Sequence, residues 1–538
     1  SQTMSGLANL YNLAEALQAI PDVYDYNNNG NRTEAVCVNA SARAQGCVPI
    51  DVYGLNADGS SRISADAIKY IKTSMSRYSK QQMHVAAANL TGTLFQLPAG
   101  PVQVAVGAEY RKEESRDIFD PLTNQARNGY VQLTDTAGKF DVKEAYGEIV
   151  VPILSDTPFF HNLTLRAAGR MSDYSTVGTF YAWNIGGEWS PVEDIRFRAV
   201  YAHATRAPNI GELFAAASAG IISITDPCQG ITATTAGALA DNCRAVPGIA
   251  ANIAANGSFT LTQADLAGVG GISANNPNIQ EETGKTLTLG AVLNPRSIHA
   301  LRNLTLTVDF FDIKLENAIS RVSAATVLNK CYREGLAEFC QFVTRRAGAS
   351  GAYSTGSVEQ VVRALVNSGG SFSRGLDFTL NYKHEVAGGT ASLSGAWTHL
   401  LKNGFRALTG DPYDNTMGEL GTPRDAVTAG LGWDNDKFGF NLSAEYIAPQ
   451  VLDYENFQTL YRLADGSVPD EKYFRIGSKI YTDLQVRYTG LEHFEFYLGV
   501  KNLFDVERPP VWGGLPGNVN GVYDVIGRRF YTGARIKF

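Results

Sequence analysis

Six cysteines are the residues of this chain whose spacing most directly suggests chemistry. They fall into three close pairs, each within one predicted loop: Cys37 and Cys47, Cys228 and Cys243, and Cys331 and Cys340. A zinc site would need CxxC spacing or a nearby histidine, and no pair has either. Six cysteines allow many connectivities, so spacing alone proves none. Because predicted strands separate the pairs, we expect three local disulfides and an oxidising compartment.

The other chemically active residue types form no catalytic constellation. The seven histidines are scattered, and no HExxH, GxSxG or Walker-type sequence is present. We therefore predict no enzyme activity, no catalytic residues and no cofactor. Asp25-x-Asn27-x-Asn29-Gly30 resembles the start of a calcium-binding loop, but Val36 stands where the bidentate acid is expected. The sequence thus favours a polar turn there and no metal site.

Loop residues are the better candidates for contact with a ligand. Aromatic rings stack on sugars or flat chelates, and carboxylates fix the orientation of a ligand. If these loops lie at the rim of a membrane protein, their exposed aromatic residues can equally be residues of the membrane–water interface. The predicted ligand-binding residues are Asp411, Tyr413, Asp414, Tyr454, Phe457, Tyr461, Trp512 and Tyr523.

An alternating strand pattern supplies the elements that would position these loops. From Phe530 to Phe538 every second residue belongs to a mostly apolar face, and Arg529, Arg535 and Lys537 lie on the opposite face. Such a strand is expected between two different solvents. The pattern recurs in about fifteen segments, which are 83–97, 101–114, 141–154, 162–175, 178–190, 193–206, 282–294, 300–317, 365–386, 388–402, 423–434, 437–450, 478–489, 493–504 and 529–538.

Composition and loop lengths identify the class of sheet. No run of apolar residues is long enough for a transmembrane helix, and the net charge of −7 argues against a nucleic-acid partner. Trp189, Trp433, Phe438 and Phe494 border tight turns, as in the aromatic girdles of membrane barrels. Short and long connections alternate along the chain. The sequence therefore predicts an all-β, transmembrane, antiparallel up-and-down β-barrel.

The alternation of connections also assigns the two sides of the membrane. Outer-membrane barrels have short periplasmic turns and long extracellular loops. Phe538 then lies at the periplasmic end, and all three cysteine pairs lie outside. We expect residues 1–80 to form an extracellular loop region, with a short loop helix at Leu7–Ala19 and no strand. Residues 81–538 are the expected barrel part, in which the Ala- and Gly-rich run 233–257 is expected to be mobile.

Local motifs resemble those of TonB-dependent outer-membrane receptors. Residues 206–214 resemble the RAPN-x-x-ELF segment, residues 276–283 the NPNLxPE-T segment, 373–377 the RG(L/V)(D/E) strand, 501–505 the NLFD segment, and 523–538 the C-terminal strand. All five occur in the family's order. The residues that match these motifs are Arg206, Pro208, Asn209, Glu212, Asn276, Pro277, Asn278, Glu282, Asn502, Phe504 and Phe538. We expect Arg206 to be structural.

The resemblance implies a barrel of 22 strands that is plugged by an N-terminal domain. The predicted strands would be the last fifteen of these, and the strands near 83–97 and 529–538 should each have an unpaired edge. The plug and the TonB-contacting segment are expected upstream of Ser1.

The implied partners are outer-membrane lipid, the TonB complex through that missing part, the barrel assembly machinery, and a small-molecule or oligosaccharide ligand. The implied function is energised uptake, across the outer membrane of a Gram-negative bacterium, of a scarce siderophore, cobalamin or oligosaccharide. A passive porin-like channel and a surface adhesion or signalling receptor are the alternatives.

Overall fold

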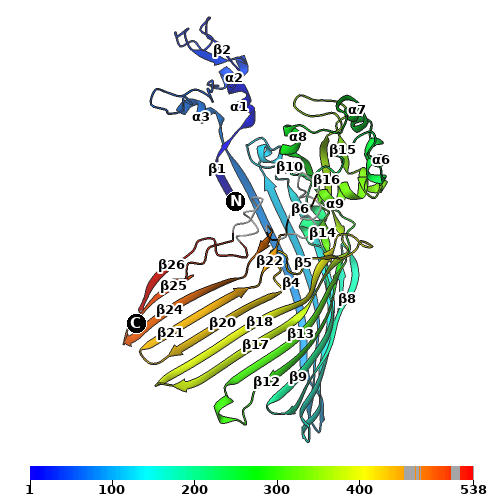
Figure 1. The fold of residues 1–538 in the computed structure, drawn as a ribbon, viewed down its shortest axis with the longest axis vertical. Helices are drawn as coiled ribbons and strands as arrows, with labels where there is room; N and C mark the ends of the chain where they lie inside the picture. Colours follow the sequence, from blue (N-terminus) through cyan, green and yellow to red (C-terminus); the bar gives the residue numbers. More distant parts are fainter. Residues whose placement is uncertain (453–466, 468–469, 471, 473, 510–520, 537–538) are drawn as a thin grey trace.

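The computed structural model describes residues 1–452, 467, 470, 472, 474–509 and 521–536. Its main feature is one large, curved antiparallel sheet (Figure 1). In order of pairing, the long strands are β1 (Gln2–Ala8), β4 (Lys72–Leu97), β5 (Gly100–Phe119), β6 (Thr136–Thr157), β7 (Phe160–Tyr174), β8 (Gly178–Val192), β9 (Ile195–Arg206), β12 (Glu282–Leu293), β13 (Leu304–Glu316), β17 (Gly370–Val386), β18 (Gly389–Arg406), β20 (Asp425–Asp434), β21 (Phe438–Ile447), β24 (Lys479–Leu491), β25 (Phe494–Lys501) and β26 (Arg529–Ile536).

All fifteen predicted strands are present, and several are longer than the pattern indicated. β4 starts at Lys72 rather than near residue 83, because its first residues pair with β1. β1 contradicts the expectation that the first 80 residues hold no strand. Its sequence hides the alternation, because Gly6 has a φ of 87° and the register shifts between Ser5 and Leu7. A bulge of this kind moves the following side chains to the other face.

The sheet has one polar and one apolar face. The registers place Glu109 opposite Glu144, Gly290 opposite Asp309 and Asn441 opposite Gln485, so polar positions stay on one side from strand to strand. Cross-strand ion pairs follow that side: Arg170 with Glu144, Arg198 with Asp309, Arg487 with Asp434, and Arg535 with Glu495. The other side exposes large apolar residues, among them Val106, Leu289, Leu431 and Leu498. This is the predicted pattern of a barrel wall between lipid and water.

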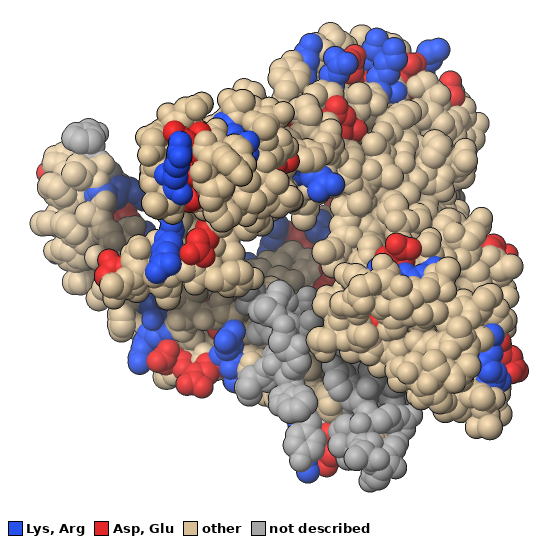
Figure 2. All heavy atoms as spheres, turned by 90° about the horizontal axis from the view of Figure 1, so that it is seen from above, with Lys and Arg blue, Asp and Glu red and all other residues tan. Residues whose placement is uncertain are grey.

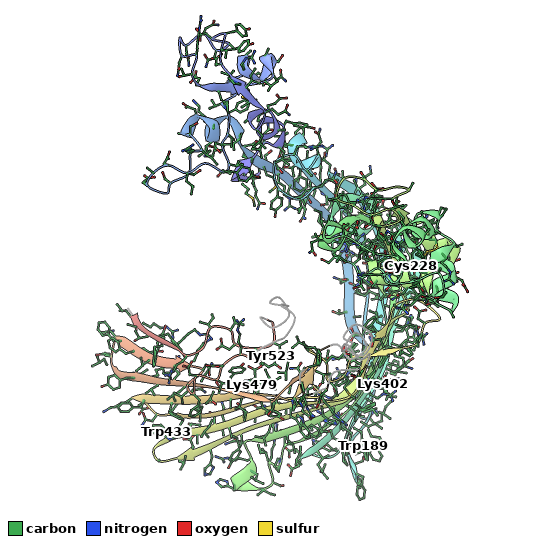
Figure 3. The ribbon with its side chains drawn as sticks, turned by 45° about the horizontal axis from the view of Figure 1, so that its top comes forward. Trp189, Cys228, Lys402, Trp433, Lys479 and Tyr523 are labelled. Atoms are coloured by element: carbon green, nitrogen blue, oxygen red, sulfur yellow. A yellow bond between two sulfur atoms is a disulfide. The ribbon has the colours of Figure 1, made fainter. Side chains whose placement is uncertain are left out.

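The two ends of the described sheet have free edges. β26 is in register with β25 alone, and residues 78–97 of β4 are in register with β5 alone. Within the part of the chain that the structure describes, no register joins β26 to β1. The sheet accordingly has the form of a trough rather than a closed cylinder (Figure 3).

Tight turns and folded loops lie at opposite ends of the trough (Figure 1). Trp189 and Trp433 lie near the tight-turn end (Figure 3), where their indole nitrogens donate to the carbonyls of Phe159 and Val386. These positions fit the predicted aromatic girdle. No helix among the described residues is both long and apolar enough to cross a membrane.

Two long loops combine into one folded unit, here called the loop module (residues 207–281 and 318–369). The first loop contributes α5 (Ile210–Phe214), β10 (Ser218–Ile222), α6 (Ala238–Arg244), α7 (Pro247–Asn256), α8 (Gln263–Ala267) and β11 (Val269–Ala274). The second contributes β14 (Ile319–Arg321), α9 (Ala324–Tyr332), α10 (Ala337–Cys340), β15 (Val343–Arg345) and β16 (Val358–Asn367). The two loops join because β11 pairs in parallel with β16.

The loop module has a hydrophobic core of its own. Ile249 and Phe259 from the first loop and Val327, Leu328 and Val361 from the second are at most 1% exposed. The run 233–257 was expected to be mobile, but it forms α6 and α7 and buries Ile249 and Ile253 in this core. Its alanines and glycines permit close packing, which composition alone did not reveal.

The first 71 residues form a second unit, here called the N-terminal module. It contains α1 (Leu10–Ala16), β2 (Ala19–Pro21), β3 (Ala35–Cys37), α2 (Ala40–Ala44) and α3 (Ala65–Ile71), and it rises from β1 at the loop end of the sheet (Figure 1). α1 lies within the predicted Leu7–Ala19 helix. The remaining short elements are α4 (Pro121–Asn124), η1 (His299–Leu301), β19 (Asp414–Asn415), β22 (Gln450–Val451) and β23 (Arg475–Ile476).

Candidate functional site

The three predicted disulfides are present and stabilise the two modules outside the sheet. Cys37 is bonded to Cys47 in the N-terminal module, and Cys228–Cys243 and Cys331–Cys340 lie in the two halves of the loop module. The described chain has no free cysteine. Because each bond closes a short segment, none of them holds the two long loops to each other. The packed core and polar contacts hold the two long loops together.

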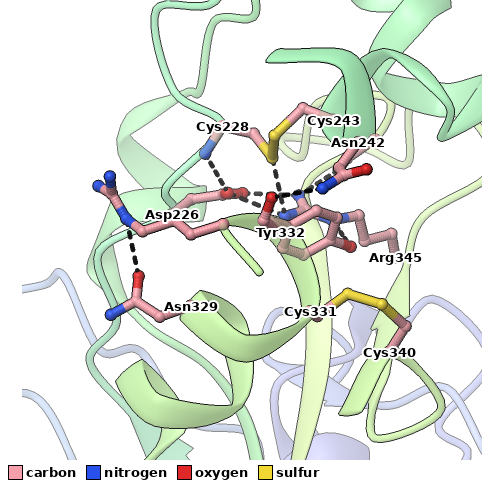
Figure 4. Close-up of a disulfide and its surroundings, with 11 residues drawn as sticks. Asp226, Cys228, Asn242, Cys243, Asn329, Cys331, Tyr332, Cys340 and Arg345 are labelled. Carbon is pink, nitrogen blue, oxygen red and sulfur yellow. Dashed lines mark hydrogen bonds and ion pairs between the residues drawn. A yellow bond between two sulfur atoms is a disulfide. The ribbon is translucent and has the colours of Figure 1, made fainter. Parts of the chain in front are cut away.

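A buried ion pair is the central polar contact of the loop module (Figure 4). The Arg345 and Asp226 side chains are 5% and 2% exposed, and their two hydrogen bonds measure 2.6 and 2.8 Å. Arg345 also donates to the Tyr332 hydroxyl at 2.7 Å. Burial alone would lower the pKa of Arg345, but the Asp226 carboxylate raises it above its usual value. The pair is therefore charged, and it connects the first loop to the second.

The RAPN and NPN motifs meet where the first loop leaves and re-enters the sheet. The Arg206 guanidinium contacts Glu282 on the neighbouring strand and donates to Glu212 at 3.0 and 3.1 Å. Glu282 also accepts a hydrogen bond from the Ile319 backbone at 2.5 Å. Three segments distant in sequence thus share one charge cluster.

The remaining motif residues also make local structural contacts. Asn209 caps α5 in a capping box with Glu212, and Pro208 is buried beside it. Asn276 donates to the Leu365 carbonyl at 3.0 Å, whereas Pro277 and Asn278 lie in an exposed turn. Asn502 is buried and bridges to Val506, and Phe504 is 70% exposed. Phe538 lies outside the described residues.

A polar cavity lies against the inner wall directly below the RAPN segment. Its volume is about 670 Å³, and its lining includes Arg111, Glu113, Phe140, Tyr174 and Asn209. Arg111 bonds Glu113 at 2.7 Å and the Tyr174 hydroxyl at 3.2 Å, and the Phe140 and Tyr174 rings lie 5.5 Å apart. Sequence analysis missed this site. Polar residues alternate on every strand, so only the register shows which of them converge.

A second polar cavity of about 550 Å³ lies on the inner wall between β20 and β26. Glu445, Asp483, Lys501 and Arg529 line it together with Tyr523, one of the predicted ligand residues. Tyr523 is 4% exposed, and its hydroxyl accepts a hydrogen bond from Gln450 at 2.6 Å (Figure 3). Burial raises the pKa of Tyr523 to about 12. The residue therefore closes one side of the cavity as a packed, neutral side chain.

The other predicted ligand residues do not form one site. Asp411 pairs with Lys330 of α9, and this carboxylate raises the pKa of Lys330 although burial would lower it. The Tyr413 ring packs edge-on against Phe372 at 4.6 Å, with Arg406 4.0 Å from its centre. Phe372 and Phe378 are an even number of residues apart on β17, so both lie on the apolar face of the sheet. Tyr413, which packs against Phe372, therefore covers the outward side of the sheet. Asp414 belongs to β19, and Tyr454, Phe457, Tyr461 and Trp512 lie outside the described residues.

Seen from the loop end, the molecule is hollowed at its centre. Both basic and acidic side chains are visible at the wall of this hollow (Figure 2). The polar inner face, its two cavities and the overlying loop module therefore form the candidate site for a polar ligand of small-molecule size.

Comparison with known proteins identifies the architecture. A family profile described as "TonB dependent receptor-like, beta-barrel" matches residues 11–503. This chain belongs to that family. Proteins of the family reside in the outer membrane of Gram-negative bacteria, and the family is one of receptors and transporters rather than enzymes.

Solved structures of similar fold are siderophore receptors. The ferric enterobactin receptor of Pseudomonas aeruginosa, in complex with enterobactin, aligns with a TM-score of 0.53 and 15% identity over 91% of this chain and 58% of that receptor. The siderophore receptor PirA of Acinetobacter baumannii aligns with a TM-score of 0.52 and 15% identity, also over 91% and 58%. The chain thus spans little more than half the length of these receptors.

Proposed function

We propose that the chain is the barrel part of an outer-membrane receptor for energised uptake of a scarce ligand, and that the ligand is a ferric siderophore. The family match over residues 11–503 carries this proposal. The siderophore receptors of similar fold support the ligand class over the cobalamin and oligosaccharide alternatives. Neither part involves covalent chemistry by this chain.

Within this proposal, residues 1–80 lie outside the cell and residues 81–538 form the barrel wall. The ligand binds below the loop module and passes along the polar inner face. Energy comes from the TonB complex, which the family name implies as a partner. Outer-membrane lipid covers the apolar face, and the barrel assembly machinery inserts the protein.

Transport assays test the proposal. Cells that express the full receptor should accumulate radiolabelled ferric siderophore, and accumulation should stop when TonB is deleted or the proton-motive force is collapsed. Uptake that continues without either would establish the passive-channel alternative. Saturable ligand binding without any accumulation would establish the adhesion or signalling alternative.

The cavity below the RAPN segment offers a sharper test of where the ligand binds. Arg111→Ala and Tyr174→Phe should weaken ligand binding, because they remove the donor and the hydroxyl that meet in this cavity. Arg296→Ala is the matched control, because Arg296 pairs with Glu193 at the opposite end of the strands, where both are more than 60% exposed. Equal ligand affinity in all three variants would exclude this cavity as the ligand-binding site.

A further inference from the structure

One carboxylate in the N-terminal module is buried without compensation. Asp22 is 0% exposed. Its Oδ1 accepts a hydrogen bond from the Tyr26 amide at 2.5 Å, but its Oδ2 has no hydrogen-bond partner. No lysine, arginine or histidine of the described chain lies within ion-pair distance of it. Burying an isolated carboxylate costs free energy, and a cation bound beside it would offset that cost.

The β2–β3 hairpin places a second carboxylate beside Asp22. The register pairs Ile20 with Val36 and Pro21 with Ala35, and the Asp22 amide then donates to the Glu34 carbonyl at 2.9 Å. Directly opposed residues of an antiparallel pair project their side chains to the same face. Two acidic side chains therefore lie on one face at the mouth of the loop 22–34.

The loop folds polar side chains back over these two acids. The Tyr26 amide, which belongs to the loop, donates to Asp22 Oδ1. The side-chain amides of Asn27 and Asn29 both converge on one oxygen of Glu34. Asp25 has a different role, since its Oδ1 accepts from the Asn29 and Gly30 amides at 2.9 and 3.1 Å and so shapes the turn.

We propose that this loop is a calcium site formed by the side-chain oxygens of Asp22, Asn27, Asn29 and Glu34. Calcium takes six to eight oxygen ligands in flexible geometry, from carboxylates, amide oxygens, carbonyls and water. The Asn27 and Asn29 Oδ1 atoms accept from the Asn29 and Asn31 backbone amides at 3.3 and 2.8 Å, and each oxygen keeps a second lone pair for the ion. No group of three His, Cys, Asp or Glu side chains suits a metal within the described residues. The site accordingly depends on its amides.

The folded hairpin supplies an acid that the calcium-like sequence from Asp25 lacks. A twelve-residue loop counted from Asp25 lacks its last acid, because Val36 stands there. In the folded hairpin Glu34 supplies that acid two positions earlier, and Asp22 adds another from before the loop. Extracellular calcium modules bind with dissociation constants of about 10⁻⁴–10⁻³ M. The proposed extracellular location of residues 1–80 suits such an affinity.

Calcium titration of the purified receptor, monitored by trypsin cleavage, tests the site. Arg32 is exposed and lies between Asn29 and Glu34, so calcium should slow cleavage after Arg32 relative to a chelator-treated sample. Cleavage after Arg62, outside the loop, is the internal control. Isothermal titration with calcium chloride should give a dissociation constant that Asp22→Asn and Glu34→Gln each raise at least tenfold. Asp58→Asn, an exposed acid of the same module, should leave it unchanged.

The outcomes separate binding from a general effect on folding. The Cys37–Cys47 bond, detected in unreduced peptides, verifies that each variant module has folded. Calcium-independent cleavage after Arg32, or equal calcium affinity in wild type, Asp22→Asn and Glu34→Gln, would overturn the proposal. Protection at both Arg32 and Arg62 that persists in Asp22→Asn would also overturn it, because calcium would then act elsewhere.

Discussion

At the scale of residues, the ion pair between Arg345 and Asp226 has the clearest energetic consequence. Removing one partner of a buried pair leaves the other charge uncompensated, at a cost of about 3–5 kcal/mol. Asp226→Ala should therefore destabilise the loop module and accelerate amide hydrogen exchange in α6 and α9. Arg296→Ala removes an exposed pair and should cost only about 0–1 kcal/mol. Similar exchange in the two variants would show that the buried pair contributes little.

Tyr523 yields a prediction on pH dependence. Its pKa is raised to about 12, whereas an unfolded tyrosine titrates near pH 10. The folded state then retains the proton longer, so the stability from this residue is complete below about pH 10 and is lost as the pH rises toward 12. The ultraviolet titration of wild type minus that of Tyr523→Phe should show one tyrosine with a midpoint near 12. A midpoint near 10 would contradict the burial of this side chain.

At the scale of elements, strands were predictable and the loop module was not. The alternation in segments such as β9, β24 and β25 is a local signal with period two, which a reader of the sequence can count. The pairing of β11 with β16 joins residues about 90 positions apart and leaves no local signal. For the same reason the disulfides, which close segments of 9 to 15 positions, were predictable. The contact of Arg206 with Glu282, 76 positions away, and the cavity at Arg111 and Tyr174 were not.

The two faces of the strands should differ in their tolerance of charge. Leu498 is 58% exposed on the apolar face, and an arginine there should cost roughly 2–4 kcal/mol if the site lies near the bilayer midplane. Gln103→Arg on the polar face should be mild. Folding yields into lipid vesicles measure the difference. Equal yields for the two variants would argue against a lipid-facing role of the apolar side.

The disulfide of the first loop should stabilise the loop module by reducing the conformational entropy of the unfolded chain. Cys228 and Cys243 are 15 positions apart, which corresponds to roughly 3 kcal/mol in the chain-entropy account. Cys228→Ser with Cys243→Ser should lower the denaturant midpoint for local unfolding of α6 and α7. Transport along the polar inner face should be measurable in the same variant. An unchanged midpoint would show that packing alone holds the helices.

At the scale of the whole molecule, the absence of free cysteines in the described chain makes the wall easy to map. Ser443→Cys on the inner face should react with a water-soluble maleimide in intact membranes, and Leu442→Cys on the outward face should not. Residue-by-residue alternation of labelling along β21 would confirm that one side faces water and the other faces lipid. Uniform labelling of both positions would contradict a membrane wall.

The shared sheet of the loop module also constrains how this protein can change over evolution. The hairpin of β12 and β13 separates the two loops in sequence, yet β11 from one loop and β16 from the other form adjacent strands of a single sheet. An insertion or exchange in either loop alone would expose the other's half of the core. New binding specificities in this region should therefore arise by paired replacement of residues 207–281 and 318–369, inherited together as one exchangeable cassette.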